Sequence, residues 1–255
     1  MTTYNIHKTA IIDETAIFGK NVTIGAYSVI HPNVTIGDNT TIDSHCVIYP
    51  NTDIGKDNNI YDHVVIGSDP QSLTFDMKSR TYVKILDSNI IREFVTIHRS
   101  TKEGIPTQIF NNTMIMAYCH IGHDCAVGNN VTMANACGLG GHTMIEDYAV
   151  LGAHTLVHQY VRIGKLSMIA GGARVTKDVI PFMLLGRDPA KHYCLNKVGI
   201  KRYGIKGEDY NALSLVFRHL KKGGDLKKVD PKTEDLQYLL SWFSVKSERG
   251  YHSFI

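Results

Sequence analysis

The fold is decided by residues 109–145, which read IFNNTMIMAYCHIGHDCAVGNNVTMANACGLGGHTMI. In this stretch an apolar side chain returns at every sixth residue, at Ile109, Ile115, Ile121, Val127, Met133, Leu139 and Ile145. The same spacing covers residues 6–66, resumes over residues 85–97 and continues to residue 175. A helix face repeats about every 3.6 residues and a strand face every 2 residues. Neither ordinary element explains this longer period.

Six residues make one short strand and one tight corner, so three units close a triangular coil of eighteen residues. Each apolar side chain then points into the prism and stacks on its equivalent one coil away, roughly 4.8 Å along the axis. A glycine often follows it, as at Gly25, Gly122 and Gly140, which suits a corner with positive φ or with closely approaching backbone. The pattern predicts an all-β solenoid, a parallel β-helix of hexapeptide repeats with about nine coils.

Two interruptions break the phase of the repeat, one near residues 68–84 and a shorter one near residues 101–107. Loops that leave a rigid scaffold often carry function. The repeat itself fades shortly after residue 175, and helical spacing follows. We therefore expect a β-helix over residues 1–186 with these two excursions, and a small α-helical C-terminal domain over residues 187–255.

The C-terminal part differs from the solenoid in pattern and in charge. Apolar side chains recur at helical spacing over residues 209–222 and 234–246, which predicts two helices. Residues 1–186 carry 13 basic and 16 acidic side chains, whereas residues 187–255 carry 14 basic and 8 acidic ones. This asymmetry indicates that an acidic partner would bind the C-terminal part.

Composition sets the broad class of the protein. The chain has 255 residues, of which 43% are hydrophobic and 20% charged, as in ordinary globular domains. No apolar run approaches the roughly 20 residues that span a bilayer, and the N-terminus has no apolar signal-peptide region. The five cysteines form no C-x-x-C pair, which is typical of a reducing compartment. We expect a cytoplasmic protein with no membrane insertion and no nucleic-acid partner.

Histidines are the candidate chemical groups. With eighteen residues to a coil, His120, His123, His142 and His158 fall on one strip of the perimeter over three successive coils. The strip spans about 10 Å, the size of a small ligand. A lone histidine on a sheet face is more often structural, but four together favour a functional site. A neighbour such as Asp124 would be able to orient a ring, although no fixed spacing establishes this.

Three rival chemistries fit the residues less well. Trimeric carbonic anhydrases of this fold bind zinc through histidines five residues apart, a spacing absent here, so we expect no metal. There is no nucleophile elbow and no phosphate-binding G-x-x-x-x-G-K-[ST] loop. Histidine, with an unperturbed pKa near 6.5, can instead deprotonate a hydroxyl that attacks an acyl carbonyl. Backbone N–H groups in the glycine corner 138–141 would hold the oxyanion, which suggests acyl transfer to an alcohol.

Several motifs resemble those of a known family. Residues 120–125 (HIGHDC), 141–142 (GH) and 157–160 (VHQY) are similar to the cytosolic UDP-N-acetylglucosamine O-acyltransferases of bacterial lipid A biosynthesis. So are residues 91–99 (IREFVTIHR) and 247–250 (SERG), and the resemblance covers essentially the whole chain. It implies a left-handed β-helix, assembled as a homotrimer with active sites between subunits. It also implies transfer of an (R)-3-hydroxyacyl chain from acyl carrier protein to the 3-hydroxyl of UDP-N-acetylglucosamine, the first step of lipid A biosynthesis, with no cofactor beyond the carrier's thioester.

The resemblance also assigns roles to residues. It implies that His123 is the general base and that the backbone of Gly141 is the oxyanion donor. Gly171 takes the position that sets acyl length, and a glycine there implies an open groove and a long chain. The positions implied to contact substrates are Gln71, His120, His142, His158 and Gln159, together with Asn196 and Arg202 at the nucleotide end. The basic C-terminal part would suit an acidic carrier protein.

The first excursion departs from the family pattern. Members usually read P-Q-D-L-K-F/Y there, whereas residues 70–75 read PQSLTF. Ser72 and Thr74 can form hydrogen bonds but supply no charge. Two alternatives therefore stay open: a paralogous acyltransferase acting on a different, amino-sugar nucleotide, and a non-catalytic solenoid that binds a carrier protein or sugar nucleotide.

Overall fold

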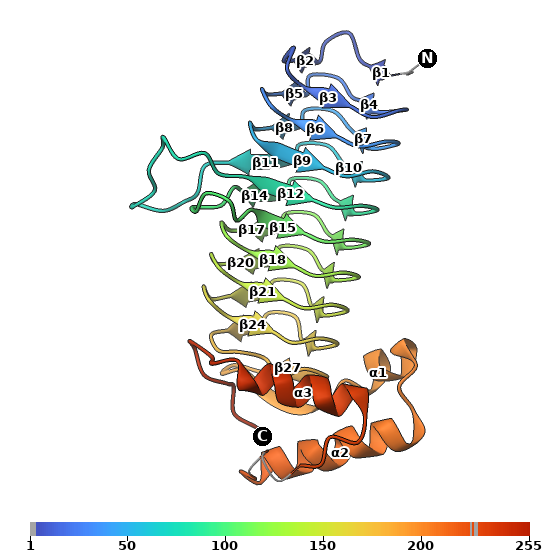
Figure 1. Ribbon diagram of the computed structural model, residues 1–255, viewed down its shortest axis with the longest axis vertical. Coiled ribbons are helices and arrows are strands. Elements are labelled where there is room, and N and C mark those ends of the chain that lie inside the picture. The colour runs from blue at the N-terminus through green and yellow to red at the C-terminus, as the bar shows by residue number, and fades with distance from the viewer. Residues whose placement is uncertain (1–3, 225, 227–228) are drawn as a thin grey trace.

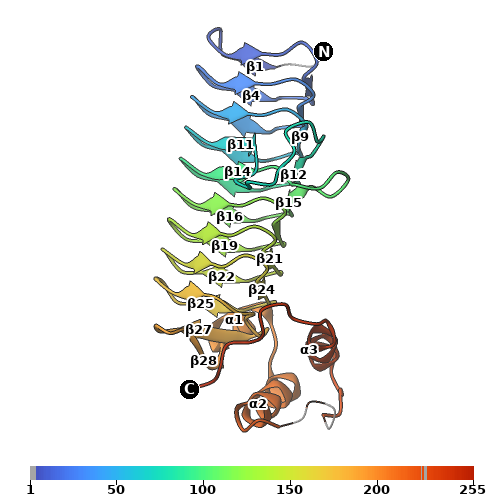
Figure 2. The same cartoon turned by 90° about the vertical axis from the view of Figure 1, so that its left-hand side faces the viewer.

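The computed structural model describes residues 4–224, 226 and 229–255. The chain winds as a stack of triangular coils with the helices at its C-terminal end (Figures 1 and 2). The first sheet contains β1 (Asn5–Ile6), β4 (Thr23–Ile24), β7 (Thr41–Ile42), β10 (Asn59–Ile60), β13 (Ile90–Ile91), β16 (Met114–Ile115), β19 (Thr132–Met133), β22 (Val150–Leu151), β25 (Met168–Ile169), β27 (Met183–Gly186) and β28 (Lys191–Leu195).

The other two sheets form the remaining walls of the prism. The second sheet contains β2 (Ile11–Ile12), β5 (Val29–Ile30), β8 (Val47–Ile48), β11 (Val65–Ser68), β14 (Thr96–His98), β17 (His120–Ile121), β20 (Gly138–Leu139), β23 (Leu156–Val157) and β26 (Arg174–Val175). The third contains β3 (Ile17–Phe18), β6 (Thr35–Ile36), β9 (Thr52–Ile54), β12 (Val83–Ile85), β15 (Thr107–Ile109), β18 (Ala126–Val127), β21 (Met144–Ile145) and β24 (Arg162–Ile163).

Each strand from β1 to β26 pairs in parallel with a strand three places before or after it along the chain. Ile121 pairs with Leu139, and Leu139 pairs with Val157, at the expected separation of eighteen residues. The inward aliphatic side chains form one continuous buried core. The left-handed parallel β-helix is confirmed, with about ten coils where about nine were expected.

The corners show which of two explanations for the glycines is right. Positive φ falls three residues after the inward side chain, at non-glycine residues such as Asn39 (57°) and His142 (61°). Apart from Gly67, whose φ is 86°, the described glycines next to the inward side chains serve close approach instead. A Cβ on Gly122 would lie 2.7 Å from the carbonyl oxygen of Leu139, one coil away. Any larger residue would push neighbouring coils apart.

The two interruptions leave the prism without disturbing its stacking. They connect β11 to β12 and β14 to β15, and both project from the same side of the solenoid (Figure 1). The inward register survives them, since Ile60 pairs with Ile91 and Ile97 pairs with Ile121. The backbone N–H of Arg80 in the longer excursion donates to Glu103 Oε1 in the shorter one at 2.9 Å, so the two excursions touch.

The C-terminal part closes the last coil. β28 pairs antiparallel with β27 and leads into α1 (Lys197–Tyr203), α2 (Gly207–Lys221) and α3 (Glu234–Ser244). The helices predicted over 209–222 and 234–246 are confirmed as α2 and α3 with slightly shifted ends, whereas α1 was not predicted. The division into domains at residue 186 stays a prediction. No helix in the described part of the chain has the length and apolar character needed to cross a bilayer.

Candidate active site

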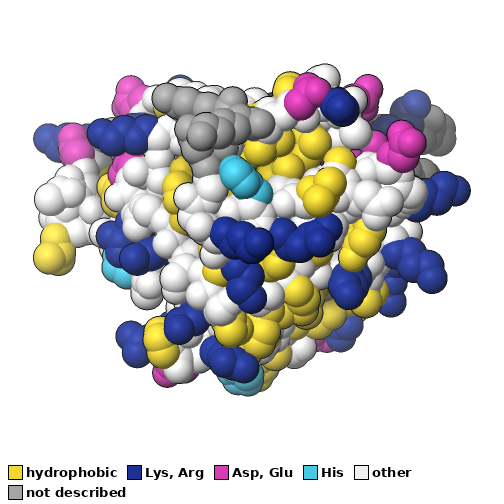
Figure 3. All heavy atoms as spheres, turned by 90° about the horizontal axis from the view of Figure 1, so that it is seen from below, with side chains coloured by type: hydrophobic (Ala, Val, Ile, Leu, Met, Phe, Trp, Pro, Cys, Tyr) yellow, Lys and Arg dark blue, Asp and Glu magenta, His cyan; other side chains and the backbone are white. Residues whose placement is uncertain are grey.

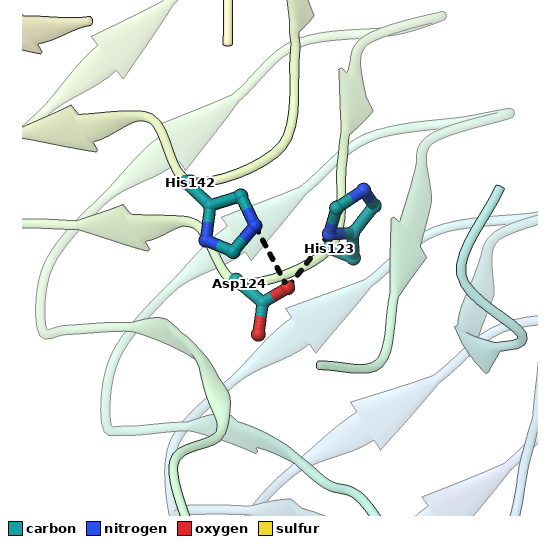
Figure 4. A group of neighbouring side chains, drawn as sticks. All are labelled: His123, Asp124 and His142. Carbon is teal, nitrogen blue, oxygen red and sulfur yellow. Dashed lines mark hydrogen bonds and ion pairs between the residues drawn. The ribbon is translucent and has the colours of Figure 1, made fainter. Parts of the chain in front are cut away.

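Two histidines and one carboxylate meet at the corner between the second and third sheets. His123 and Asp124 follow β17, and His142 follows β20 one coil further on. His123 Nδ1 lies 2.6 Å from Asp124 Oδ2, and His142 Nε2 lies 3.6 Å from the same oxygen (Figure 4). The two rings meet edge to face with centroids 5.2 Å apart. The predicted convergence of imidazoles from successive coils is thus found for this pair.

Asp124 is held in the ionised form by hydrogen bonds. Its side chain is only 6% exposed. The Thr101 backbone N–H donates to Oδ1 at 3.0 Å, and the Thr101 hydroxyl donates to Oδ2 at 2.8 Å. Burial acts to raise the pKa of Asp124, but the hydrogen bonds from His123 and Thr101 outweigh it and lower the pKa. A carboxylate acceptor favours the proton on His123 Nδ1, which leaves Nε2 free to accept one.

Gly141 lies directly against the His123 ring. A Cβ on Gly141 would be 2.5 Å from His123 Cε1 and 2.6 Å from Nε2, so only glycine fits there. The Gly141 carbonyl accepts a hydrogen bond from the Tyr160 N–H at 3.1 Å. The Gly141 N–H makes no hydrogen bond within the described residues. An unused donor beside a free imidazole nitrogen is the arrangement that an oxyanion requires.

A pocket of about 450 Å³ opens in front of these groups. Its lining residues are Gln71, Ser72, Thr74, Phe75, Asp76, Ser79, Thr101, His123, His142, Gln159 and Tyr160. The Tyr160 ring stacks on His142 with centroids 4.6 Å apart. The longer excursion therefore forms one wall of the pocket, and the histidine corner forms the other.

Four of the predicted site residues line this pocket, namely Gln71, His123, His142 and Gln159. His120 does not line it, because it projects from β17 toward the neighbouring coil. His120 Nδ1 is 2.8 Å from Thr96 Oγ1, and its ring meets His98 edge to face at 4.8 Å. His158 is exposed and also lies outside the pocket, with Nδ1 3.2 Å from the Gln159 carbonyl oxygen.

The remaining predicted residues lie outside the pocket within a single chain. Gly171 occupies an exposed corner after β25. The Asn196 side chain caps α1, accepting from the Gly199 N–H at 3.1 Å, while its amide donates to the Leu166 carbonyl at 2.9 Å. Arg202 lies exposed in the last turn of α1.

Burial lowers the basicity of the histidines around the dyad. It lowers the pKa of His142, with His123 acting in the same direction and Asp124 opposing. It lowers the pKa of His98 to about 4, reinforced by His120 and His123. The Nδ1 atom of His98 is buried without a hydrogen-bond partner in the described part of the chain. These two rings stay neutral near pH 7.

The same groups would offer ligands to a metal ion. One ligand atom each from His123, Asp124 and His142 lie within 4.8 Å of one another. The 2.6 Å contact between His123 Nδ1 and Asp124 Oδ2 is a hydrogen bond, which would compete with an ion for these two atoms. We interpret the cluster as a hydrogen-bonded dyad, and the absence of a metal stays a prediction for elemental analysis.

Known proteins share this architecture and sequence. A family model described as UDP N-acetylglucosamine O-acyltransferase, domain 2, matches residues 178–252, and a model of hexapeptide repeats matches residues 33–68 and 106–141. The acyl-[acyl-carrier-protein]–UDP-N-acetylglucosamine O-acyltransferase of Syntrophobacter fumaroxidans is 42% identical over 254 residues, covering 96% of this chain and 98% of its own length. The chain belongs to the UDP-N-acetylglucosamine O-acyltransferase family.

Other members of the UDP-N-acetylglucosamine O-acyltransferase family match most of the chain. The enzyme of Trichlorobacter lovleyi is 47% identical over 234 residues, which cover 88% of this chain and 89% of its own. The solved structure of the Francisella novicida UDP-N-acetylglucosamine acyltransferase superposes with a TM-score of 0.91 at 35% identity, covering 97% and 94% of the two chains. The resemblance and the enzyme class inferred from sequence motifs are confirmed.

Sequence reasoning missed several pocket residues of this family member. Tyr160 follows His142 by eighteen residues, so the coil period alone would have placed it on that ring. Thr101 had no such signal, because the shorter excursion separates it from Asp124 by an irregular 23 residues. Phe75 and Asp76 lie in the longer excursion, where no period exists.

Proposed function

We propose that this chain transfers an (R)-3-hydroxyacyl chain from acyl carrier protein to the 3-hydroxyl of UDP-N-acetylglucosamine, with His123 as general base. This reaction is the first step of lipid A biosynthesis. The observation that carries the proposal is the His123–Asp124 dyad: His123 lines the pocket, and its free nitrogen lies beside Gly141. Family membership supports the substrates, and the geometry supports the roles of the residues.

The chemistry follows from these positions. His123 Nε2 accepts the proton of the sugar hydroxyl as its oxygen attacks the thioester carbonyl. The Gly141 N–H stabilises the negative charge that forms on the carbonyl oxygen, and Asp124 stabilises the imidazolium. The intermediate then collapses to the ester and expels the carrier's thiolate, which takes the proton from His123. No cofactor is needed, because the thioester is the activated donor.

The distribution of charge supports acyl carrier protein as the acyl donor. Lysine and arginine side chains spread over the end of the molecule that carries the C-terminal helices (Figure 3). The basic residues of the C-terminal part include Lys197, Lys201, Arg202 and Lys206, and these four do not line the pocket. Such a surface attracts an acidic carrier protein. We place the enzyme in the cytoplasm as a homotrimer whose neighbouring subunits complete each site.

The pocket also favours a second candidate acceptor. Ser72 Oγ lies 3.3 Å from Thr74 Oγ1, so these hydroxyls bond to each other. No lysine or arginine of the described chain lines the pocket, and neither Lys78 nor Lys84 reaches it, whereas Asp76 does. A carboxylate without a cation beside it suits an acceptor that carries an amine in place of the 3-hydroxyl. The same dyad would deprotonate that amine as it attacks the thioester.

The test compares both acceptors with one 3-hydroxyacyl carrier protein. We expect ester formation with UDP-N-acetylglucosamine, a loss of about 1,000-fold in kcat for His123→Ala, and a loss of about 100-fold for Asp124→Asn. His45→Asn changes an exposed imidazole on another corner and should keep full activity. Amide product alone would select the amino-sugar acceptor. Binding without any product would select the non-catalytic solenoid, and wild-type turnover in His123→Ala would refute the base.

A further inference from the structure

The Arg99 side chain contacts the longer excursion at Asp69, Phe75 and Ser79, and we call these three contacts the grip. The guanidinium Nε and Nη2 atoms donate to Asp69 Oδ1 at 3.0 and 2.8 Å. Nη1 donates to the Ser79 carbonyl oxygen at 3.4 Å, and the guanidinium carbon lies 5.1 Å from the centre of the Phe75 ring. These contacts reach the beginning, the middle and the end of the loop. One side chain anchored beside β14 thus spans the whole segment.

Between residues 69 and 79, Arg99 provides the side-chain contacts that tie the excursion to the solenoid, whereas Arg80 bonds to Glu103 and the chain rejoins the solenoid from Tyr82 onward. The internal hydrogen bonds of the excursion are local turns, such as Phe75 N–H to the Ser72 carbonyl and Ser79 N–H to the Asp76 carbonyl. Arg99 is only 13% exposed, whereas its partner Asp69 is 47% exposed, so solvent and salt screen this ion pair only in part. A planar donor fork that bonds a carboxylate and stacks on an aromatic ring is a task for which lysine is no substitute.

The gripped loop is the acceptor wall of the pocket. Phe75 and Ser79 line the pocket on one side and contact Arg99 on the other. Arg99 itself does not line the pocket. Releasing the grip would therefore move Gln71 and Asp76 away from the histidine corner without altering the dyad.

We propose that Arg99 is a positioning residue that holds the excursion of residues 68–84 against the pocket and so sets the affinity for the acceptor. This inference rests on the proposed function, because it takes the pocket to be the acceptor site. Arg99 stabilises the binding-competent loop, and the free loop reduces apparent affinity in proportion to the fraction of time it spends open.

The chain offers a matched control in Arg92. Its guanidinium pairs with Glu93 at 2.8 Å and lies 4.5 Å from the Tyr61 ring centre, the same combination of carboxylate and aromatic partners. Within the described part of the chain, the Arg92 side chain pairs with Glu93 and Tyr61 rather than with the excursion, and it lies outside the pocket. Arg99→Gln and Arg92→Gln thus remove the same type of contact at two places.

Two readouts test the grip in the full-length protein. For Arg99→Gln we expect faster hydrogen exchange over residues 69–80 and a Kd for UDP-N-acetylglucosamine raised about tenfold, with kcat at saturation and the donor KM within about twofold of wild type. Arg99→Lys should be intermediate, and Arg92→Gln should match wild type in both readouts. A merely structural loss would lower kcat and thermal stability together.

The outcomes separate this inference from the proposed function. Unchanged exchange and unchanged Kd in Arg99→Gln would overturn the grip, as would a fall in kcat at constant Kd. Wild-type protein that binds the sugar nucleotide but transfers no chain would overturn the proposed function and leave exchange and Kd to decide the grip. If the wild type binds no sugar nucleotide, the acceptor half of the inference is wrong.

Discussion

At the scale of single residues, packing and chemistry impose the same requirement at Gly141. The ring of His123 occupies the space that any side chain at this position would need. The same contact places Gly141, whose N–H makes no hydrogen bond within the described residues, beside His123 Nε2. The dyad is rigid for a related reason, since Asp124 is bonded by both donors of Thr101. Preorganised donors of this kind need no rearrangement when charge develops.

Replacing Gly141 by alanine should lower activity while the protein still folds. The new Cβ would displace the His123 ring by about 1 Å, and a misplacement of that size costs about 100-fold in kcat. The control is Gly138→Ala, whose Cβ meets only the flexible tip of Leu156 at 3.2 Å. Steady-state kinetics and thermal denaturation of both variants check this, and near wild-type turnover in Gly141→Ala would contradict the site geometry.

Sequence predicted residues well wherever the coil period reached them. His123 and His142 meet because their separation of nineteen residues places them on adjacent coils at one corner. The period did not separate residues that face the pocket from those that turn away, so His120 and His158 looked equivalent to them. Which way a corner side chain turns depends on neighbours such as Thr96, and period alone does not give that contact.

At the scale of elements, the C-terminal segment is fastened by two neutral histidines. His192 Nε2 accepts from the Ile180 N–H at 3.0 Å, and its Nδ1 lies 3.0 Å from the His252 carbonyl oxygen. His252 Nε2 accepts from the Lys177 N–H at 3.2 Å, and its Nδ1 lies 3.0 Å from the Ala190 carbonyl oxygen. Each ring accepts one N–H, so a second proton on either ring would oppose a backbone donor.

The hydrogen bonds of His192 and His252, here called the clamp, should stabilise the fold less in acid. Burial lowers the pKa of His192 to about 4 and also lowers that of His252, with Lys177 acting in the same direction and Asp178 opposing. The unfolded chain binds the proton below about pH 6.5. The stabilisation is therefore complete above pH 6.5 and is lost as the pH falls toward 4, at no more than about 1.4 kcal/mol per pH unit for each ring.

Urea unfolding at several pH values measures this slope, and hydrogen exchange over residues 250–255 locates it. His192→Gln keeps a donor and an acceptor but does not titrate, so its free energy of unfolding should depend less on pH between 6.5 and 4. The exposed His7 provides the comparison, because His7→Gln should leave the slope unchanged. An identical slope in His192→Gln would mean that this clamp does not carry the acid sensitivity.

The repeating and longer elements could be predicted from the sequence, whereas the shortest helix could not. The β-helix was predictable because each coil repeats the same demand for an inward aliphatic and a tight corner. Helices α2 and α3 were predictable from their apolar faces, including Leu213 and Leu239. Helix α1 has seven residues and only one buried side chain, Ile200, so its periodicity is too short to detect. Its start depends on the side-chain cap from Asn196, and in the sequence such an asparagine cannot be told from one in an ordinary turn.

At the scale of the whole molecule, the solenoid and the helices are joined by specific contacts as well as by apolar packing. Arg162 on β24 pairs with Asp178 at 3.0 Å, and its guanidinium lies 4.4 Å from the Trp242 ring centre. Tyr238 on α3 donates a hydrogen bond to Glu146 beside β21. The helical part is thereby fixed to the end of the prism. Its basic surface, with Arg202, keeps one orientation relative to the coils that carry His123.

That fixed geometry leads to a test of assembly. Asn196 and Arg202 do not line the pocket that contains His123 in one chain, so in a homotrimer they would serve a neighbouring subunit's site. His123→Ala and Arg202→Ala should each be inactive alone. Co-expressed, they should form mixed trimers in which some sites combine an intact His123 with an intact Arg202 from the neighbour. Random assembly at equal amounts would restore about a quarter of wild-type activity in the unfractionated protein and about a third in the isolated mixed trimers. Differently tagged subunits and tandem purification would isolate the mixed trimers, and sedimentation would confirm their mass.

The two variants mixed after assembly, without subunit exchange, provide the control. Mixed trimers with no more activity than the separate variants would show that each chain builds its site alone.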